Sequence, residues 1–199
     1  HVVVRSGRKG LLAEVYQPSI TEEAHDGESA LACLKHNFYD LVLLDIQMPN
    51  TDALGLMEYF KIKFPDLKVL VFSMSPENIY AKRFLKAGAK GFISKDAPLQ
   101  ELKTAITRVL NSGRYISTDL AESLAMTEDQ QKDNNIFNRL SAREFEIANL
   151  LLDGQNLSSI ANTLHLRVST IGTHKARIFE KLHIKNLLQL KDLAVSYRL

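Results

Sequence analysis

The sequence predicts an α/β doubly wound domain followed by a smaller all-α helix-turn-helix domain, within a chain of 199 residues. Two observations support this. Short apolar runs at 41–44, 69–72 and 91–94 alternate with segments of helical apolar periodicity, which is typical of βαβ units in a parallel sheet. From residue 139 onwards the apolar spacing is helical only. A chain of this length accommodates one or two domains.

The composition is that of an ordinary globular protein, with 45% hydrophobic and 24% charged residues. No apolar run approaches the roughly 18 residues of a membrane span, and no signal peptide is visible, which favours a cytoplasmic protein without a membrane partner. The single cysteine, Cys33, cannot form an internal disulfide and is expected in the core. The net charge of +2 divides into +4 for residues 136–199 and −2 for the remainder, a weak indication of nucleic-acid binding.

The elements of the first part follow from apolar spacing and from glycine and proline positions. Residues 2–16 have a helix-like pattern that ends before Pro18, and 19–24 form a short polar strand candidate. Further strands are expected at 41–44, 69–72 and 91–94, and further helices at 28–35, 54–60, 76–88, 98–113 and 115–125.

Three of the expected strands end in polar residues. Asp45, Ser73 and Lys95 each directly follow an expected strand. Because the carboxyl ends of parallel strands meet at one edge of a sheet, a carboxylate, a hydroxyl and an ammonium group are expected to converge there. Each of these residues alone would be an ordinary cap or surface charge, and the combination is what indicates a site.

Residues 1–113 resemble the receiver domain of two-component response regulators. The matching motifs are LVLLDIQMP around Asp45, VLVFS ending at Ser73, and KAGAKGFISKDA around Lys95. The resemblance implies a CheY-like, flavodoxin-like sheet of order 2-1-3-4-5. It makes Asp45 the phosphoacceptor, Ser73 the hydroxyl that contacts the phosphoryl group, Lys95 its cationic partner, and Phe92 the aromatic residue that responds to the hydroxyl.

The resemblance also implies a Mg²⁺ cofactor, held in part by the carboxylate of Asp45 and the backbone carbonyl of Gln47. Receivers carry an acidic pair at the end of their first strand, directly before a His-x-x-x-Arg helix start, which His1 and Arg5 match. We therefore expect the first strand and the remaining acidic ligands to precede His1. Ala53 replaces a glycine that is usual in the family.

The second part begins after a linker with a short helix, assigned to 114–138, and occupies 139–199. Ser141 and Glu144 form a capping-box pattern at the start of a helix. Helices are then expected at 156–164, 168–182 and 187–197, and two short helices followed by a basic third helix are typical of a helix-turn-helix. Together with the pieces VSTIGTH and IFEKL, this segment resembles the LuxR-type DNA-binding domain.

The helix at 168–182 is expected to contact DNA. Its predicted buried side contains Val168, Ile171, Ile178, Phe179 and Leu182, and His174 is expected to pack at the edge of that side. Gly172 and Ala176 lie on the opposite side, so base contacts should come from hydroxyl and methyl groups, with further cations contacting phosphates. The candidate DNA-binding residues are Arg167, Ser169, Thr170, Thr173, Lys175, Arg177 and Lys181, with Lys185 as a further phosphate contact.

Together the two resemblances identify a NarL/FixJ-type response regulator. They imply that a sensor histidine kinase phosphorylates Asp45, that phosphorylation controls homodimerisation and binding to double-stranded promoter DNA, and that RNA polymerase is a further partner. An alternative is a phosphorylation-independent DNA-binding regulator whose degenerate receiver serves as a dimerisation module. We expect no enzyme activity: Asp45-Ile46-Gln47 lacks the second aspartate that aspartate-based phosphatases use as acid and base.

Overall fold

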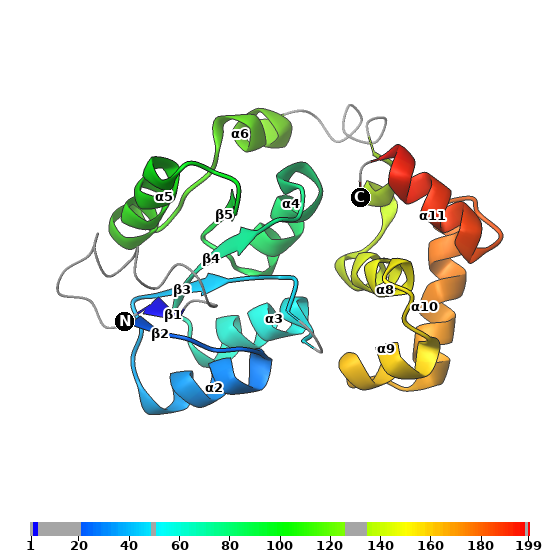
Figure 1. Ribbon diagram of the computed structural model, residues 1–199, viewed down its shortest axis with the longest axis horizontal. Coiled ribbons are helices and arrows are strands. Elements are labelled where there is room, and N and C mark those ends of the chain that lie inside the picture. Colours follow the sequence, from blue (N-terminus) through cyan, green and yellow to red (C-terminus); the bar gives the residue numbers. More distant parts are fainter. Residues whose placement is uncertain (1, 4–20, 49–50, 126–134, 198) are drawn as a thin grey trace. The chain divides into compact units, whose positions relative to one another are not determined.

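The chain folds into two compact units, His1–Ala121 and Glu122–Leu199 (Figure 1). The structure is a computed structural model that describes residues 2–3, 21–48, 51–125, 135–197 and 199. The described elements of the first unit are strands and helices, and those of the second are helices only. The predicted fold class is therefore confirmed. Residues 126–134 of the predicted linker lie outside the described residues.

A five-stranded parallel sheet in the order β2-β1-β3-β4-β5 forms the centre of the first unit. This order is the one that the resemblance implies. The strands are β1 (Val2–Val3), β2 (Thr21–Glu22), β3 (Leu41–Leu44), β4 (Lys68–Ser73) and β5 (Gly91–Ser94). Leu44 pairs with Val71, and Ser73 pairs with Ser94, so β3, β4 and β5 end near the same edge.

The position of Val2–Val3 corrects one expectation. We expected these residues at the start of a helix and the central strand before His1. Instead they pair with Thr21–Glu22 of β2 on one side and with Leu41–Val42 of β3 on the other. The gap between β2 and β3 exposes unpaired backbone groups on both strands, and two β-branched residues suited to a strand fill it. Residues 4–16 of the predicted helix and the predicted acidic pair lie outside the described residues.

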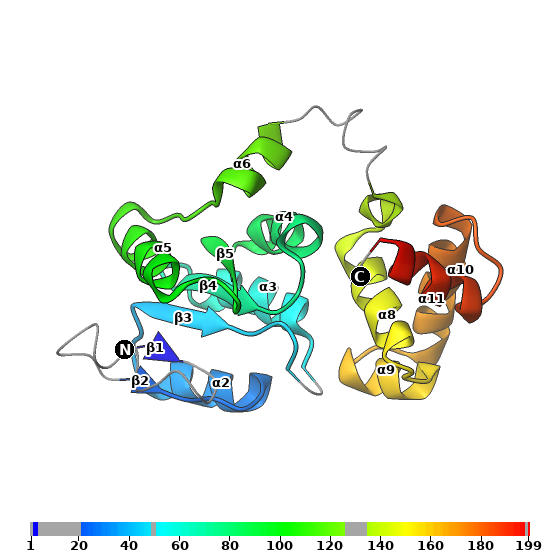
Figure 2. The same ribbon diagram turned by 45° about the horizontal axis from the view of Figure 1, so that its top comes forward.

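Helices cover both faces of this sheet, with α5 on one face and α2, α3 and α4 on the other (Figure 2). These helices are α2 (Gly27–His36), α3 (Ala53–Lys63), α4 (Glu77–Ala87) and α5 (Leu99–Ser112). A further helix, α6 (Thr118–Ala125), follows α5 in the chain. The residues that alternate along each strand divide between the two faces. The core between the sheet and α5 contains Leu41, Leu43, Leu70, Phe72 and Ile93 from the strands and Leu102, Ala105, Ile106 and Val109 from α5.

Side-chain caps and a glycine fix the ends of the helices beside the sheet edge. Asp26 accepts a hydrogen bond from the Ser29 backbone and caps α2, and Asp52 does the same for α3 through Gly55. Gly88 ends α4 with a φ of 117°, a left-handed conformation that favours glycine. The predicted end of this helix at Gly88 is therefore confirmed.

The second unit packs four α-helices around one core. The elements are the 3₁₀ helix η1 (Ile136–Arg139), α8 (Ala142–Leu152), α9 (Leu157–Thr163), α10 (Val168–Lys181) and α11 (Leu187–Ser196). The predicted capping box between Ser141 and Glu144 is present. The sequence did not predict η1. It forms because the side chain of Asn135 accepts the Phe137 N–H, and Phe137 is fully buried against the rings of Phe145 and Tyr197.

The described part of the chain contains no helix that is both long enough and apolar enough to span a bilayer.

Candidate functional site

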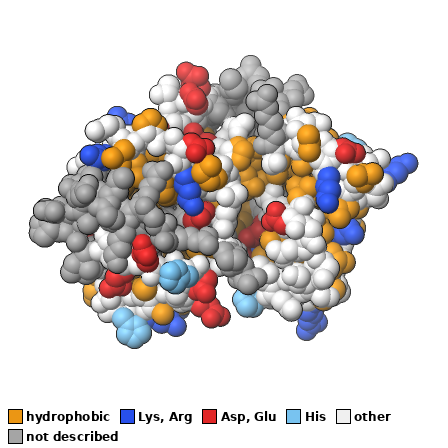
Figure 3. All heavy atoms as spheres, viewed as in Figure 1, with side chains coloured by type: hydrophobic (Ala, Val, Ile, Leu, Met, Phe, Trp, Pro, Cys, Tyr) orange, Lys and Arg blue, Asp and Glu red, His pale blue; other side chains and the backbone are white. Residues whose placement is uncertain are grey.

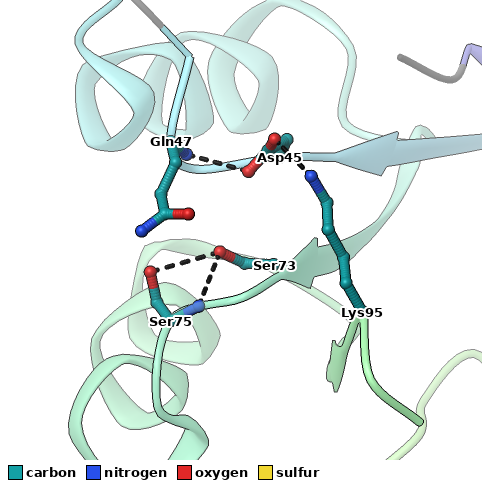
Figure 4. A network of polar contacts seen from close by, with 5 residues as sticks. All are labelled: Asp45, Gln47, Ser73, Ser75 and Lys95. Carbon is teal, nitrogen blue, oxygen red and sulfur yellow. Dashed lines mark hydrogen bonds and ion pairs between the residues drawn. The ribbon is translucent and has the colours of Figure 1, made fainter. Parts of the chain in front are cut away.

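The three predicted strand-end residues lie close together at the carboxyl edge of the sheet (Figure 4). Asp45 follows β3 and is only 7% exposed. Lys95 follows β5, and its Nζ lies 2.6 Å from Oδ2 of Asp45. The other carboxylate oxygen, Oδ1, accepts the backbone N–H of Gln47 at 2.9 Å. Both carboxylate oxygens of Asp45 therefore accept hydrogen bonds, one of them from a cationic side chain.

Ser73 completes the predicted set, but its hydroxyl does not point at Asp45. Its Oγ lies 3.2 Å from the hydroxyl of Ser75 and accepts the backbone N–H of Ser75 at 3.1 Å (Figure 4). Both serines are buried, with exposed fractions of 0% and 4%. The backbone carbonyl of Ser73 also accepts the N–H of Lys95 at 2.9 Å, which ties the ends of β4 and β5 together.

Ser75 is a site residue that the sequence analysis missed. Its signal was the i, i+2 spacing of Ser73 and Ser75, because alternate residues of an extended segment lie on the same side. Figure 4 also shows the side chain of Gln47 extending toward this pair of serines. The carboxylate of Asp45 and the hydroxyl of Ser73 thus belong to two adjacent hydrogen-bonded groups.

The aromatic residues beneath the site are buried. Phe92 of β5 has an exposed fraction of 0%, so its ring lies in the core. Phe72 of β4 lies under Lys95, whose Nζ is 5.9 Å from the ring centroid. A cation at this distance is attracted to the face of the ring. Lys95 is therefore held both by the carboxylate and by the aromatic surface.

The described residues supply only part of a magnesium site. Mg²⁺ prefers near-octahedral oxygen coordination. Among the described residues no group of three His, Cys, Asp or Glu side chains is placed to hold a metal ion. Asp45 has both oxygens engaged by Lys95 and Gln47. The carboxylate of Asp45 and the carbonyl of Gln47 alone do not fit a Mg²⁺ ion.

The predicted DNA-contacting residues are distributed along α10 and its first turn. Arg167, Ser169, Thr173 and Arg177 are exposed, whereas Thr170 and Lys175 are partly buried. Thr173 donates its hydroxyl to the carbonyl of Ser169 at 3.1 Å, which leaves the lone pairs of the hydroxyl and its methyl group available. In the view of Figure 3, the Lys and Arg side chains of the described residues are scattered and form no continuous basic patch on the side shown.

One prediction about α10 is wrong, and a second is confirmed. Val168 was expected on the buried side but is 47% exposed, because it lies in the first turn, beyond the buried positions Ile171 and Ile178. His174 was expected to pack at the edge of the buried side, and it is partly buried with its Nδ1 enclosed.

Two lysines of α10 have partners within the unit. Lys181 places its Nζ 2.6 Å from Oε2 of Glu144, which is 3% exposed. Lys175 places its Nζ 5.4 Å from the ring centroid of Phe179. The ion pair joins the last turn of α10 to the first turn of α8. The sequence did not predict this ion pair, because its two residues are 37 positions apart and no spacing rule connects them.

Comparison with known proteins decides the family. Residues 1–107 match the family model of the response regulator receiver domain, and residues 138–194 match that of bacterial regulatory proteins of the luxR family. The chain belongs to the response regulators. The curated relatives include the response regulator GacA of Pseudomonas viridiflava, 35% identical over 99% of this chain and 92% of that protein. The response regulator UvrY of Escherichia coli K12 is 31% identical over 100% of this chain and 92% of that protein.

Solved response regulators share the fold. RcsB of Salmonella enterica serovar Typhimurium, bound to promoter P1flhDC in the presence of phosphomimetic BeF3-, superposes with a TM-score of 0.76 at 20% identity. The match covers 98% of this chain and 97% of that chain. A second structure, of an RcsB–DNA complex, gives a TM-score of 0.74 at 20% identity, covering 96% of both chains. The two-domain architecture of this response regulator is therefore an established one.

Proposed function

We propose that this response regulator is a DNA-binding transcription regulator controlled by phosphorylation of Asp45. The observation that carries the proposal is the position of Asp45, a buried carboxylate at the end of β3 with the ammonium of Lys95 at 2.6 Å. A buried hydroxyl, that of Ser73, lies on the adjacent strand end. This arrangement supplies a nucleophile, a cation to offset phosphoryl charge and a hydroxyl that can change partners.

The phosphodonor is a phosphohistidine of a sensor kinase. A carboxylate oxygen of Asp45 bonds to phosphorus, the phosphorus–nitrogen bond breaks, and the histidine nitrogen keeps the electron pair and takes a proton. The product carries about −1.5 to −2 charge units and several strong acceptor oxygens. Lys95 then faces more negative charge than before, and the hydroxyl of Ser73 gains an acceptor that is stronger than the hydroxyl of Ser75.

The output is binding to double-stranded promoter DNA by a homodimer. The relative RcsB is described in complexes with promoter DNA, and two RcsB dimers are described on two parallel DNAs. In this chain α10 follows α9 as the third helix of the unit, and its exposed residues Ser169, Thr173 and Arg177 can contact base edges. Arg167 and Lys185 are exposed and suited to phosphates. RNA polymerase is a further expected partner.

The deciding experiment treats the full chain with acetyl phosphate and Mg²⁺. Mass spectrometry should show one added phosphoryl group on wild type and none on Asp45→Asn. Duplexes selected from a random pool should bind wild type more tightly after treatment. Asp66→Asn, which removes an exposed carboxylate away from the site, is the matched control and should behave as wild type. Phosphorylation without any change in DNA binding or dimerisation would favour the phosphorylation-independent regulator instead.

A further inference from the structure

The hydroxyl of Ser117 joins the first turn of α4 to the start of α6. Its Oγ lies 3.0 Å from both carboxylate oxygens of Glu77 and accepts the backbone N–H of Leu120 at 3.1 Å. A hydroxyl has one proton and two lone pairs, so it can donate to the carboxylate and cap the helix at the same time. The carbonyl of Ser117 accepts the N–H of Ala121, as expected of a residue that begins a helix.

Glu77 lies close in sequence to the candidate phosphorylation site. It is the first residue of α4, and Pro76 alone separates it from Ser75. Ser75 is the residue whose N–H and hydroxyl contact the hydroxyl of Ser73. A displacement of the segment from Ser73 to Ser75 must therefore move the start of α4, because only one peptide unit of proline, with its fixed φ, lies between them.

The contact between Glu77 and Ser117 is not an ordinary exposed one. Glu77 is partly buried, and this burial raises its pKa. The hydrogen bond from Ser117 lowers the pKa of Glu77, whereas the charges of Asp119 and Glu101 raise it further. The charged form of Glu77 thus depends on the Ser117 hydroxyl for part of its stabilisation.

A second contact holds the same segment to a different helix. Tyr115 donates its hydroxyl to Oε1 of Glu101 at 2.8 Å, and its backbone N–H bonds the carbonyl of Lys90. Glu101 lies in the first turn of α5, which is not adjacent to the Ser73 segment in sequence. The residues between α5 and α6 are thus anchored to two helices, and of these only α4 begins within two residues of the segment from Ser73 to Ser75.

We propose that the Glu77–Ser117 hydrogen bond couples the phosphorylation state of Asp45 to the N-terminal cap of α6. The inference rests on the proposed function and names the residue pair that transmits it. When the Ser73 hydroxyl leaves Ser75 for a phosphoryl oxygen, the start of α4 moves, and Glu77 either carries Ser117 with it or releases it. In both cases the start of α6, which precedes the second unit in the chain, changes its position or its stability.

The test measures how strongly acetyl phosphate, with Mg²⁺, increases the affinity of the full chain for a selected duplex. Glu77→Ala removes the acceptor and leaves the Ser117 cap in place, whereas Ser117→Ala removes both contacts. Ser117→Thr keeps the hydroxyl and should restore the wild-type response. Glu101→Ala is the matched control, because it removes an equal charge and a hydrogen bond to the same segment from α5.

The expected result is a loss of response at unchanged phosphorylation of Asp45. The ratio of affinities with and without acetyl phosphate should fall at least about fivefold, toward one, in Glu77→Ala and Ser117→Ala. It should stay at the wild-type value in Ser117→Thr and Glu101→Ala. Hydrogen exchange at residues 120–121 should respond to acetyl phosphate in wild type and not in Glu77→Ala, and circular dichroism should show that each variant is folded.

Three outcomes would overturn the proposal. Wild-type ratios in Glu77→Ala and Ser117→Ala would show that the coupling runs elsewhere, with the proposed function intact. An equal loss in Glu101→Ala would show that the segment is merely loosened. A wild-type ratio of one, despite phosphorylation of Asp45, would instead refute the proposed function and this inference together.

Discussion

Lys181→Met should destabilise the second unit because it leaves a buried carboxylate without its cation. Glu144 has 4% of its side chain exposed, and the Nζ of Lys181 lies 2.6 Å from its Oε2. The lysine side chain is 40% exposed, so water screens one end of the pair. We expect a loss of about 2 kcal/mol, between the roughly 0–1 kcal/mol of an exposed pair and the roughly 3–5 kcal/mol of breaking a buried one.

Glu144→Gln, which removes the negative charge of the pair, should destabilise the second unit less than Lys181→Met does. Glu144→Gln removes the charge but keeps an amide oxygen that can accept the N–H of Ser141, so the capping box survives. The double variant Glu144→Gln/Lys181→Met should therefore be more stable than the sum of the single losses predicts, because no charge remains buried alone. Lys185→Met, which removes an exposed lysine just beyond α10, is the matched control and should change stability by less than about 0.5 kcal/mol.

The destabilisation should depend on pH in a defined direction. Burial raises the pKa of Glu144, but the hydrogen bonds from Lys181 and Ser141 outweigh it, and the net pKa lies below the ordinary 4.5. A carboxyl whose pKa is lowered on folding contributes stability that is present above its unfolded pKa and is lost as the pH falls through the folded one. The difference in stability between wild type and Lys181→Met should thus be largest at neutral pH and should shrink as the pH falls below 4.5.

The assay is hydrogen exchange with mass spectrometry on the full chain, followed on peptides of α8 and α10. It reports local opening free energies of the second unit without requiring that unit to fold alone. Protection of these peptides in Lys181→Met within about 0.5 kcal/mol of wild type, or additive losses in the double variant, would refute the argument. The ion pair would then make no measurable contribution to the stability of the second unit.

Three further substitutions test other parts of the structure. Gly172→Ala should stabilise α10 by about 0.8–1 kcal/mol, since an added Cβ meets no atom within 4 Å, and urea unfolding checks this. Gly91→Ala should destabilise the first unit by about 1–3 kcal/mol, because its Cβ would lie 2.8 Å from the carbonyl oxygen of Tyr115, and thermal unfolding measures the loss. Thr173→Ala should change the preferred base at one position of a selected duplex without weakening binding to random DNA, as competition binding would show.

The sequence predicted the elements and the edge of the sheet because both follow from short-range patterns. Continuous apolar runs at 41–44 and 69–72, with the shorter apolar segment in 91–94, identify buried parallel strands, and parallel strands place Asp45 and Lys95 at one edge. The capping box of α8 likewise lies within four residues. Where the physical cause of a feature is local, the pattern of residue types is enough to predict that feature.

The features that the sequence did not predict depend on contacts between distant segments or on rotamers. The ion pair between Glu144 and Lys181 joins two helices, and no spacing rule connects them. The exposure of Val168 depends on how far α10 extends past its neighbours, since the helical period alone places it with Ile171 and Ile178. The central position of Val2–Val3 depends on a gap between two other strands.

The orientation of Ser73 supports the switch that we propose for the candidate site. Its hydroxyl already has a donor in the Ser75 N–H and a partner in the Ser75 hydroxyl, so moving toward Asp45 means giving up both contacts. A phosphoryl oxygen can offset that loss because hydrogen bonds to charged acceptors are roughly twice as strong as those between neutral groups. The carboxylate of Asp45 already accepts hydrogen bonds from Lys95 and Gln47, so by itself it does not supply that new acceptor. Under the proposed function, the two hydrogen-bonded groups exchange partners when the phosphoryl group is added, which is the condition for a two-state response.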